Sequence, residues 1–306
     1  MFEIVFLGTS ASAPSVSRNL SASMVLYKHY RFLIDCGEGT QRQLLKSGLG
    51  FKRLQRMLLT HGHLDHLLGL GGLVSTFSRW EAVESLEIYG GRWALERVED
   101  LIFGVVLRGA TPPIQLEFVE LSPGVILEDA DFVLSCFPVT HRGPGCFGFT
   151  FQERSRRPFL VEEAERLGVP AGKERRLLVE EQPVTLGDGR RILPDQVLGP
   201  PRPGAKLVYV GDAAQIEDLI PYASEADGLV IESTYLAAEE DLAGEYGHLT
   251  ATRAAALARE AGVGTLYLNH ISRRYHTQDV LREAQTVFPN TRVARDFDRF
   301  QIKRQE

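Results

Sequence analysis

The 306-residue chain is poor in cysteine and has no long apolar stretch. Its three cysteines are odd in number and form no C-x-x-C pair, which argues against a disulfide framework or a cysteine zinc site. No apolar run approaches the roughly 20 residues that span a bilayer. The N-terminus also lacks the basic segment and the cleavage site of a secretory signal. These absences predict a cytoplasmic protein with no membrane association.

The chain also lacks an excess of positive charge. Thirty-four basic residues stand against forty acidic ones, and the formal net charge is −6. A protein that binds nucleic acid with its whole surface is therefore excluded, and any contact with a polyanion must use a local basic patch. Hydrophobic residues at 44% and charged residues at 24% are ordinary for a folded chain.

Strand and helix patterns alternate from end to end, which predicts an α/β architecture. The expected strands are 3–7, 22–27, 31–34, 56–59, 86–89, 132–139, 206–210, 228–232 and 265–268, and the expected helices are 40–47, 65–77, 93–103 and 250–261. The stretch 152–203 differs, because it holds seven prolines and two arginine-rich clusters. It is predicted to be an inserted arm between the two parts of a main domain, 1–151 and 204–306.

The strongest chemical signal is the run Thr60-His61-Gly62-His63-Leu64-Asp65-His66, directly after an expected strand. Residues i and i+2 of an extended segment point to the same side, so His61 and His63 can bind one metal ion. Asp65 and His66, at the start of the next expected helix, can face a second ion. Imidazole with carboxylate suits zinc or manganese and favours hydrolysis over iron redox chemistry. The alternative is a polar loop with incidental histidines, which so dense a cluster disfavours.

Three distant residues complete two metal sites. His141, Asp212 and His270 each follow an expected strand, at the edge where α/β sheets collect functional residues. Each alone would more often be a turn or core residue, but their common placement favours ligands. If Asp212 bridges two ions, each ion has three or four protein ligands, with room for a shared hydroxide.

The H-x-H-x-D-H run with the later His, Asp and His resembles the metallo-β-lactamase superfamily and, within it, the ribonuclease Z family that matures tRNA 3′ ends. The resemblance extends over about residues 2–300. Its further motifs are FLGT (6–9) with Pro14 and Arg18-Asn19, DCGEGTQ (35–41), EST (232–234), GHLT (247–250) and HISRRY (270–275). It implies an αββα four-layer sandwich with an inserted arm, two Zn²⁺ per chain with Mn²⁺ as the alternative, and a homodimer.

The resemblance also implies the role of each site residue. One ion would bind His61, His63, His141 and Asp212, and the other Asp65, His66, Asp212 and His270. Asp65 would accept the proton of the attacking water, and His248, oriented by Glu232, would protonate the leaving oxygen. Arg274 would hold a phosphate, and Arg18 is a further candidate RNA contact. The alternatives are a helix-cap role for His248, a strand-end charge for Glu232 and a plain surface arginine at Arg274.

The inserted arm resembles the family's tRNA-binding exosite. Between residues 152 and 176, seven basic residues stand against five acidic ones. Such contacts to the RNA backbone carry affinity without sequence information, whereas the alternative is a solvated helical face. The candidate contacts are Arg154, Arg156, Arg157, Lys173, Arg175 and Arg176. The chain departs from the family pattern twice, with Ser15-Val16-Ser17 in place of a lysine-containing loop and Gly172-Lys173 in place of Gly-Pro.

Three functions follow. The first is a zinc-dependent endoribonuclease that removes the 3′ trailer from precursor tRNA and leaves a 3′-hydroxyl. The second is a phosphodiesterase or ester hydrolase of the same superfamily that acts on small substrates. The third is an RNA-binding protein built on a structural metal core, which the open bridging position between two ligand sets disfavours.

Overall fold

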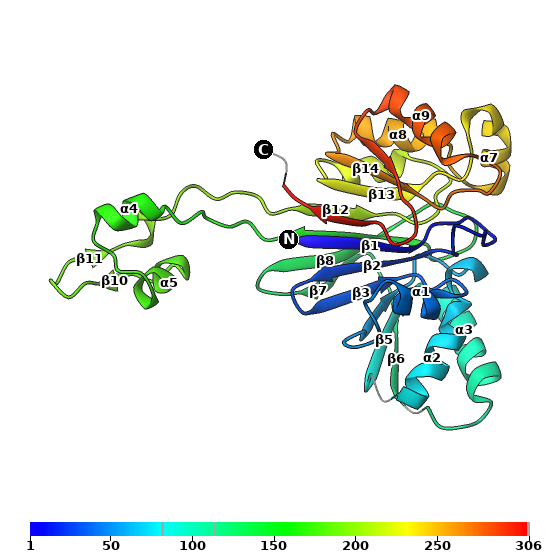
Figure 1. Ribbon diagram of the computed structural model, residues 1–306, viewed down its shortest axis with the longest axis horizontal. Coiled ribbons are helices and arrows are strands. Elements are labelled where there is room, and N and C mark those ends of the chain that lie inside the picture. Colours follow the sequence, from blue (N-terminus) through cyan, green and yellow to red (C-terminus); the bar gives the residue numbers. More distant parts are fainter. Residues whose placement is uncertain (81–82, 113, 305–306) are drawn as a thin grey trace. The chain divides into compact units, whose positions relative to one another are not determined.

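The structure, a computed structural model, describes residues 1–80, 83–112 and 114–304. Two units are present, one formed by Met1–Gln152 and Ala205–Glu306 and the other by Glu153–Gly204. In the larger unit two seven-stranded sheets pack face to face, with helices beside each outer face (Figure 1). In the described part of the chain, no helix is both long enough and apolar enough to cross a membrane.

The first sheet is mixed. The pairs β16–β1, β1–β2 and β2–β3 are antiparallel, and β3 to β6 run parallel to one another. Its strands, in spatial order, are β16 (Arg299–Ile302), β1 (Phe2–Gly8), β2 (Ala22–Tyr27), β3 (Tyr30–Ile34), β4 (Arg56–Leu58), β5 (Ser85–Gly90) and β6 (Gln115–Glu120).

The second sheet has a parallel half formed by β12 to β15, and β9 pairs antiparallel with β12. Its strands, in spatial order, are β15 (Thr291–Val293), β14 (Thr265–Asn269), β13 (Gly228–Glu232), β12 (Lys206–Tyr209), β9 (Phe147–Glu153), β8 (Phe132–Pro138) and β7 (Gly124–Glu128). Parallel strands present their carboxyl ends at one edge, so residues that follow β12, β13 and β14 gather there.

Three hydrophobic layers hold the sandwich together. The middle layer between the sheets is rich in aromatic rings, among them Phe2, Phe32 and Phe151. The ring centres of Phe2 and Phe151 lie 5.7 Å apart. The first sheet is covered by α1 (Thr40–Lys46), α2 (Gly69–Trp80) and α3 (Arg92–Glu99). The second is covered by α6 (Ile220–Ala223), α8 (Ala251–Glu260) and α9 (Thr277–Val287), and α7 (Glu240–Tyr246) precedes α8.

Sequence periodicity predicted where the helices lie more accurately than where they begin and end. Helix α8 is rich in alanine, whose small side chains let it pack closely on the sheet, and the Thr250 side chain caps it by accepting a hydrogen bond from the Arg253 N–H at 3.2 Å. The helix expected over 93–103 is α-helical only to Glu99 and continues as a π-helix over Asp100–Leu107. Ile102 is the one buried residue of this mostly apolar π-helix, so the spacing of its hydrophobic residues did not indicate the change of helix type.

The helix expected over 65–77 begins later than predicted. Asp65 and His66 lie in a 3₁₀ turn, Leu64–His66, and α2 starts at Gly69. The cause is a contact distant in sequence, because the Gly69 N–H donates to the Cys36 carbonyl at 2.8 Å. A Cβ at Gly69 would lie 2.1 Å from the Gly37 carbonyl oxygen, so only glycine permits this approach.

The smaller unit has its own core. It contains α4 (Val161–Arg166), α5 (Lys173–Val179) and the hairpin of β10 (Val184–Thr185) and β11 (Arg191–Ile192). Its buried residues are Ala164, Val169, Leu178, Val184, Ile192 and Val197. The segment predicted to be an inserted arm lies almost wholly within this unit.

Candidate metal centre

Strand ends from both sheets supply the predicted ligands. His61 and His63 follow β4 of the first sheet, whereas His141, Asp212 and His270 follow β8, β12 and β14 of the second. His270 has a φ of +53°, a backbone conformation uncommon for residues with a side chain. Such local strain is typical of functional positions, and here it places the imidazole at the edge of the sheet.

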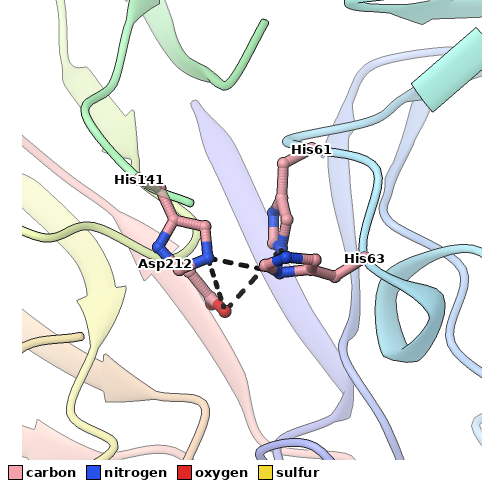
Figure 2. A group of neighbouring side chains, drawn as sticks. All are labelled: His61, His63, His141 and Asp212. Atoms are coloured by element: carbon pink, nitrogen blue, oxygen red, sulfur yellow. Dashed lines mark hydrogen bonds and ion pairs between the residues drawn. The ribbon is translucent and has the colours of Figure 1, made fainter. Parts of the chain in front are cut away.

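The first group converges on one point (Figure 2). Nδ1 of His63 lies 3.0 Å from Nε2 of His61 and 3.3 Å from Nε2 of His141. Oδ2 of Asp212 lies 3.8 Å from each of those two Nε2 atoms. In a tetrahedral zinc site with bonds of about 2.0–2.1 Å, ligand atoms lie roughly 3.3 Å apart. The four side chains therefore fit one metal ion.

The second group lies directly beside the first. Nε2 of His270 is 3.2 Å from Nε2 of His66 and 3.3 Å from Oδ2 of Asp65. Oδ2 of Asp212 is 3.6 Å from Nε2 of His66, so the same oxygen faces both groups. Asp212 therefore lies beside both groups, and its role as a bridge between two ions stays a prediction.

In most of the histidines, Nδ1 faces away from the centre and makes a hydrogen bond that fixes the orientation of the ring. Nδ1 of His66 bonds Asp35 at 2.8 Å, Nδ1 of His141 donates to the Gly247 carbonyl at 2.7 Å, and Nδ1 of His270 donates to Thr234 at 2.9 Å. His61 bonds the Thr60 hydroxyl in the same manner at 3.0 Å. Each contact leaves Nε2 facing the centre, as in known metal sites.

Burial and charge hold the first group in its metal-binding form. Burial, together with the neighbouring imidazole of His66, lowers the pKa of His61 well below its usual value, and burial lowers the pKa of His63 to about 4. Both rings are therefore neutral at pH 7, the form that binds a metal.

In the second group, His66 shows the opposite shift. Burial disfavours a charged His66, but the carboxylates of Asp212, Asp65 and Asp35 outweigh it and raise the His66 pKa well above its usual value.

One orphaned atom supports a metal ion at this position. Oδ1 of Asp212 is buried and accepts no hydrogen bond from the residues that the structure describes, and Nδ1 of His270 lies 3.4 Å from it. A buried carboxylate oxygen without a hydrogen bond is costly unless a cation compensates it. Donor types, spacing and excess negative charge all fit divalent ions bound by imidazole and carboxylate.

His248 and Glu232 form a second, linked pair. Oε1 of Glu232 accepts from Nδ1 of His248 at 2.9 Å and from the Ala213 N–H at 2.8 Å, and Oε2 accepts from the Thr234 hydroxyl at 2.5 Å. Burial opposes protonation of His248, but Glu232 outweighs it and raises the His248 pKa to about 9. Nδ1 of His248 also lies 3.7 Å from Oδ2 of Asp212, so this pair adjoins the predicted metal ligands.

Arg274, a predicted phosphate contact, lies at a hollow beside the metal ligands. Arg274 is exposed, pairs with Glu239 at 3.2 Å and lines a hollow of about 440 Å³ together with Ser12, Thr234 and Tyr235. The Ser12 N–H donates to Asp65 at 2.9 Å, so this hollow adjoins the metal ligands.

Arg18 is engaged within the fold. Its guanidinium donates to the Thr9 hydroxyl and the Ala294 carbonyl, both at 2.6 Å, and to the Thr277 hydroxyl at 3.0 Å. Burial lowers its pKa. A contact between Arg18 and RNA stays a prediction.

Three of the candidate contacts in the smaller unit lie beside carboxylates of the same unit. Arg157 bonds Asp195 at 2.6 Å, Arg175 lies 3.8 Å from Glu165, and Arg176 bonds Glu180 at 2.9 Å. Arg154, Arg156 and Lys173 are exposed, and Lys173 is the first residue of α5. In the larger unit, Val16 of the Ser15-Val16-Ser17 loop, which departs from the family pattern, is fully exposed.

Three supporting residues were not predicted from the sequence. Asp35 accepts from the Thr60 N–H and hydroxyl, both at 2.8 Å, and bonds His66, and Thr234 bonds both His270 and Glu232. Asp35 and Thr234 stand within quoted motifs, and Thr60 opens the histidine run. Asp35 also follows directly after a strand, which is the signal that could have identified it.

The fold and this centre define a hydrolase of the metallo-β-lactamase fold. The metallo-β-lactamase fold protein YhfI of Bacillus subtilis superposes with a TM-score of 0.70 at 19% identity, covering 98% of this chain and all of that one. A family model described as the anti-Pycsar protein Apyc1 matches residues 2–115. The predicted fold class is confirmed.

Longer comparisons narrow the class to a family. Ribonuclease Z of Bradyrhizobium diazoefficiens is 48% identical over 97% of this chain and 99% of its own length. Ribonuclease Z of Methanothermobacter thermautotrophicus is 38% identical over 99% of this chain and 97% of its own. The short form of human tRNase Z superposes with a TM-score of 0.70 at 26% identity, covering 98% and 99% of the two chains. The chain belongs to the ribonuclease Z family, as its motifs predicted.

Proposed function

We propose that this protein is a metal-dependent endoribonuclease that removes the 3′ trailer from precursor tRNA and leaves a 3′-hydroxyl. The supporting observation is the convergence of His61, His63, His141 and Asp212, with Asp65, His66 and His270 beside them, in a chain of the ribonuclease Z family. Family membership supports the choice of tRNA, and the donor set supports hydrolysis.

Two Zn²⁺ ions are the proposed occupants, one held by His61, His63, His141 and Asp212 and one by Asp65, His66, Asp212 and His270. Bound there, such ions would acidify a water molecule and offset the charge that develops on a phosphoryl group. Mn²⁺ is the alternative, because imidazole and carboxylate ligands also suit it.

The proton transfers are assigned to residues of the chain. Water attacks phosphorus, the bond to the 3′ oxygen breaks, and the phosphate stays on the trailer. Asp65 accepts the proton that the water loses. Its carboxylate is ionised, because His66 and the His270 hydrogen bond outweigh the effect of burial and lower the Asp65 pKa. His248, protonated through Glu232, donates a proton to the leaving oxygen. Arg274 holds a phosphate of the substrate at the adjoining hollow.

The inserted unit is proposed to contact the tRNA backbone, chiefly through the exposed side chains of Arg154, Arg156 and Lys173. Cations of this kind bind phosphates irrespective of sequence and make the affinity depend on salt. A homodimer and a cytoplasmic location complete the proposal and rest on the family resemblance and the sequence composition. Light scattering after size exclusion tests the dimer, and a mass of one chain contradicts it.

The first experiment incubates zinc-loaded protein with a 3′-extended precursor tRNA and sizes the products on a gel. Cleavage at one position after the discriminator base is expected, and Asp65→Ala should lose it while tRNA binding remains. A hairpin RNA and a bis-aryl phosphodiester serve as control substrates. Hydrolysis of the diester alone would move the function to the small-substrate class, and binding without any cleavage would support a structural metal core.

Charge reversal tests the role of the inserted unit. Lys173→Glu should raise KM for precursor tRNA, make the affinity less steeply dependent on salt and leave diester hydrolysis unchanged. Lys28→Glu, a reversal in the larger unit at a lysine that pairs with Asp131, is the matched control. An equal loss on both substrates would contradict the assignment of this unit to tRNA binding.

A further inference from the structure

Trp93 lies where two ligand-bearing loops meet. It stands in the first turn of α3, and the loop with His61 and His63 and the loop with His141 both approach its indole ring. A Cβ at Gly62 would lie 2.6 Å from Cε3 of this ring, and a Cβ at Gly143 would lie 2.5 Å from Cζ3. Both distances are far below van der Waals contact, so the backbone of each loop rests directly on the ring.

Arg97 holds this ring and one of the loops together. Its guanidinium lies 4.6 Å from the centre of the Trp93 ring, within the range of a cation–π interaction. Its Nη1 donates to the Gly62 carbonyl at 3.1 Å. Gly62 lies between His61 and His63, so Arg97 connects α3 to the turn that presents both ligands.

The ring also touches one ligand directly. The His63 imidazole meets Trp93 edge to face, with ring centres 5.5 Å apart and planes at 86°. This arrangement is favourable for aromatic pairs and limits rotation of His63. Trp93 thus contacts the turn that carries His61, the ring of His63 and the loop that follows His141.

We propose that Trp93, held by Arg97, is a positioning residue that fixes the separation of the two loops and so sets the metal affinity of the first group. The inference rests on the proposed metal centre. Asp65, His66 and His270 are oriented instead by contacts to Ser12, Asp35 and Thr234, so the second group should be affected less.

The test measures zinc binding rather than catalysis. Chelator-stripped protein is titrated with Zn²⁺ against a chromogenic chelator, and two dissociation constants are fitted. Trp93→Ala should weaken one of them by about 10–100-fold, the usual loss when a partner that orients metal ligands is removed. Val98→Ala is the matched control, because Val98 is fully buried on the same helix and packs in the core. It should lower thermal stability and leave both constants within about twofold.

The outcomes separate the two proposals. Zinc binding by the wild type with equal affinity in Trp93→Ala overturns the inference alone, and so does an equal weakening in Val98→Ala. A wild type that binds neither Zn²⁺ nor Mn²⁺ overturns both the proposed function and this inference, and if it binds Mn²⁺ alone, the same titration with Mn²⁺ decides. If Trp93→Ala does not fold, Arg97→Met takes its place, because it removes the cation and the bond to Gly62. Weaker zinc binding in Arg97→Met supports the inference, and unchanged binding overturns it.

Discussion

Replacing Glu232 by glutamine removes one charge from the centre and should move the protonation of His248 by more than two pH units. Glu232 is buried, and one of its oxygens accepts from both His248 and Ala213. A glutamine oxygen can keep both bonds, and the amide nitrogen takes the place of the oxygen that accepts from Thr234, so the size of the side chain is preserved and the charge is lost. Without this charge, burial and His66 lower the His248 pKa and only Asp212 still raises it, so the pKa should fall to about the ordinary value of 6.5.

The size of the effect follows from the His248 pKa of about 9 in the folded chain. The difference from 6.5 corresponds to about 3 kcal/mol of stability at 1.36 kcal/mol per pH unit. Because the folded pKa is the higher one, this contribution is fully present below pH 6.5 and is lost as the pH rises through about 9. Urea denaturation of metal-free wild type and variant should therefore show a stability difference at pH 6 that shrinks above pH 9.

Kinetic measurements on Glu232→Gln test the role of His248 as proton donor. Without bound ions, wild-type His248 is almost fully protonated at pH 7.5, whereas only about one-tenth is protonated in Glu232→Gln, so kcat/KM of the variant should fall by up to about tenfold. Bound cations lower the His248 pKa in both proteins, so the informative quantity is the ratio of variant to wild type. That ratio should rise as the pH is lowered. A constant ratio from pH 6 to 9 would refute the role of His248 as proton donor. Glu217→Gln, which removes an exposed carboxylate paired with Arg253, should leave the profile unchanged.

Three further changes test the centre and the fold. Asp212→Asn should reduce the bound metal from two ions per chain towards none, measured by elemental analysis, because Asp212 faces both groups. Asp35→Asn should weaken metal binding about 10–100-fold without removing a ligand, since Asp35 orients His66 and Thr60; isothermal titration measures the loss. Phe151→Ala, at a fully buried ring between the sheets, should cost about 3–5 kcal/mol of unfolding free energy and leave kcat of the folded protein unchanged.

The ligand set could be predicted from the sequence because its chemistry is local. Four of the seven predicted ligands occupy one six-residue run after β4, and the others each follow a strand. Orientation could not be predicted in this way. The partners that align the imidazoles, such as Asp35 on His66 and the Gly247 carbonyl on His141, come from segments far away in the chain.

Strands defined by distant pairing were also missed. β9 is buried on both faces for most of its length, so it shows no alternation, and its place follows from antiparallel pairing with β12, in which Phe151 stands opposite Leu207. β6 and β7 were not predicted either. Both are short and largely unburied, and their parallel or antiparallel pairing with β5 and β8 defines them better than their composition does.

Both sheets contribute ligands to the proposed metal centre. Each proposed ion takes ligands from both sheets, with His61, His63, Asp65 and His66 on one side and the residues after β8, β12 and β14 on the other. The aromatic layer between the sheets stabilises the sandwich independently of any ion. At the edge, by contrast, like-charged carboxylates face each other, and a cation relieves their repulsion. The fold therefore brings the ligands near one another, and the proposed cations would both supply the chemistry and offset the repulsion at this edge.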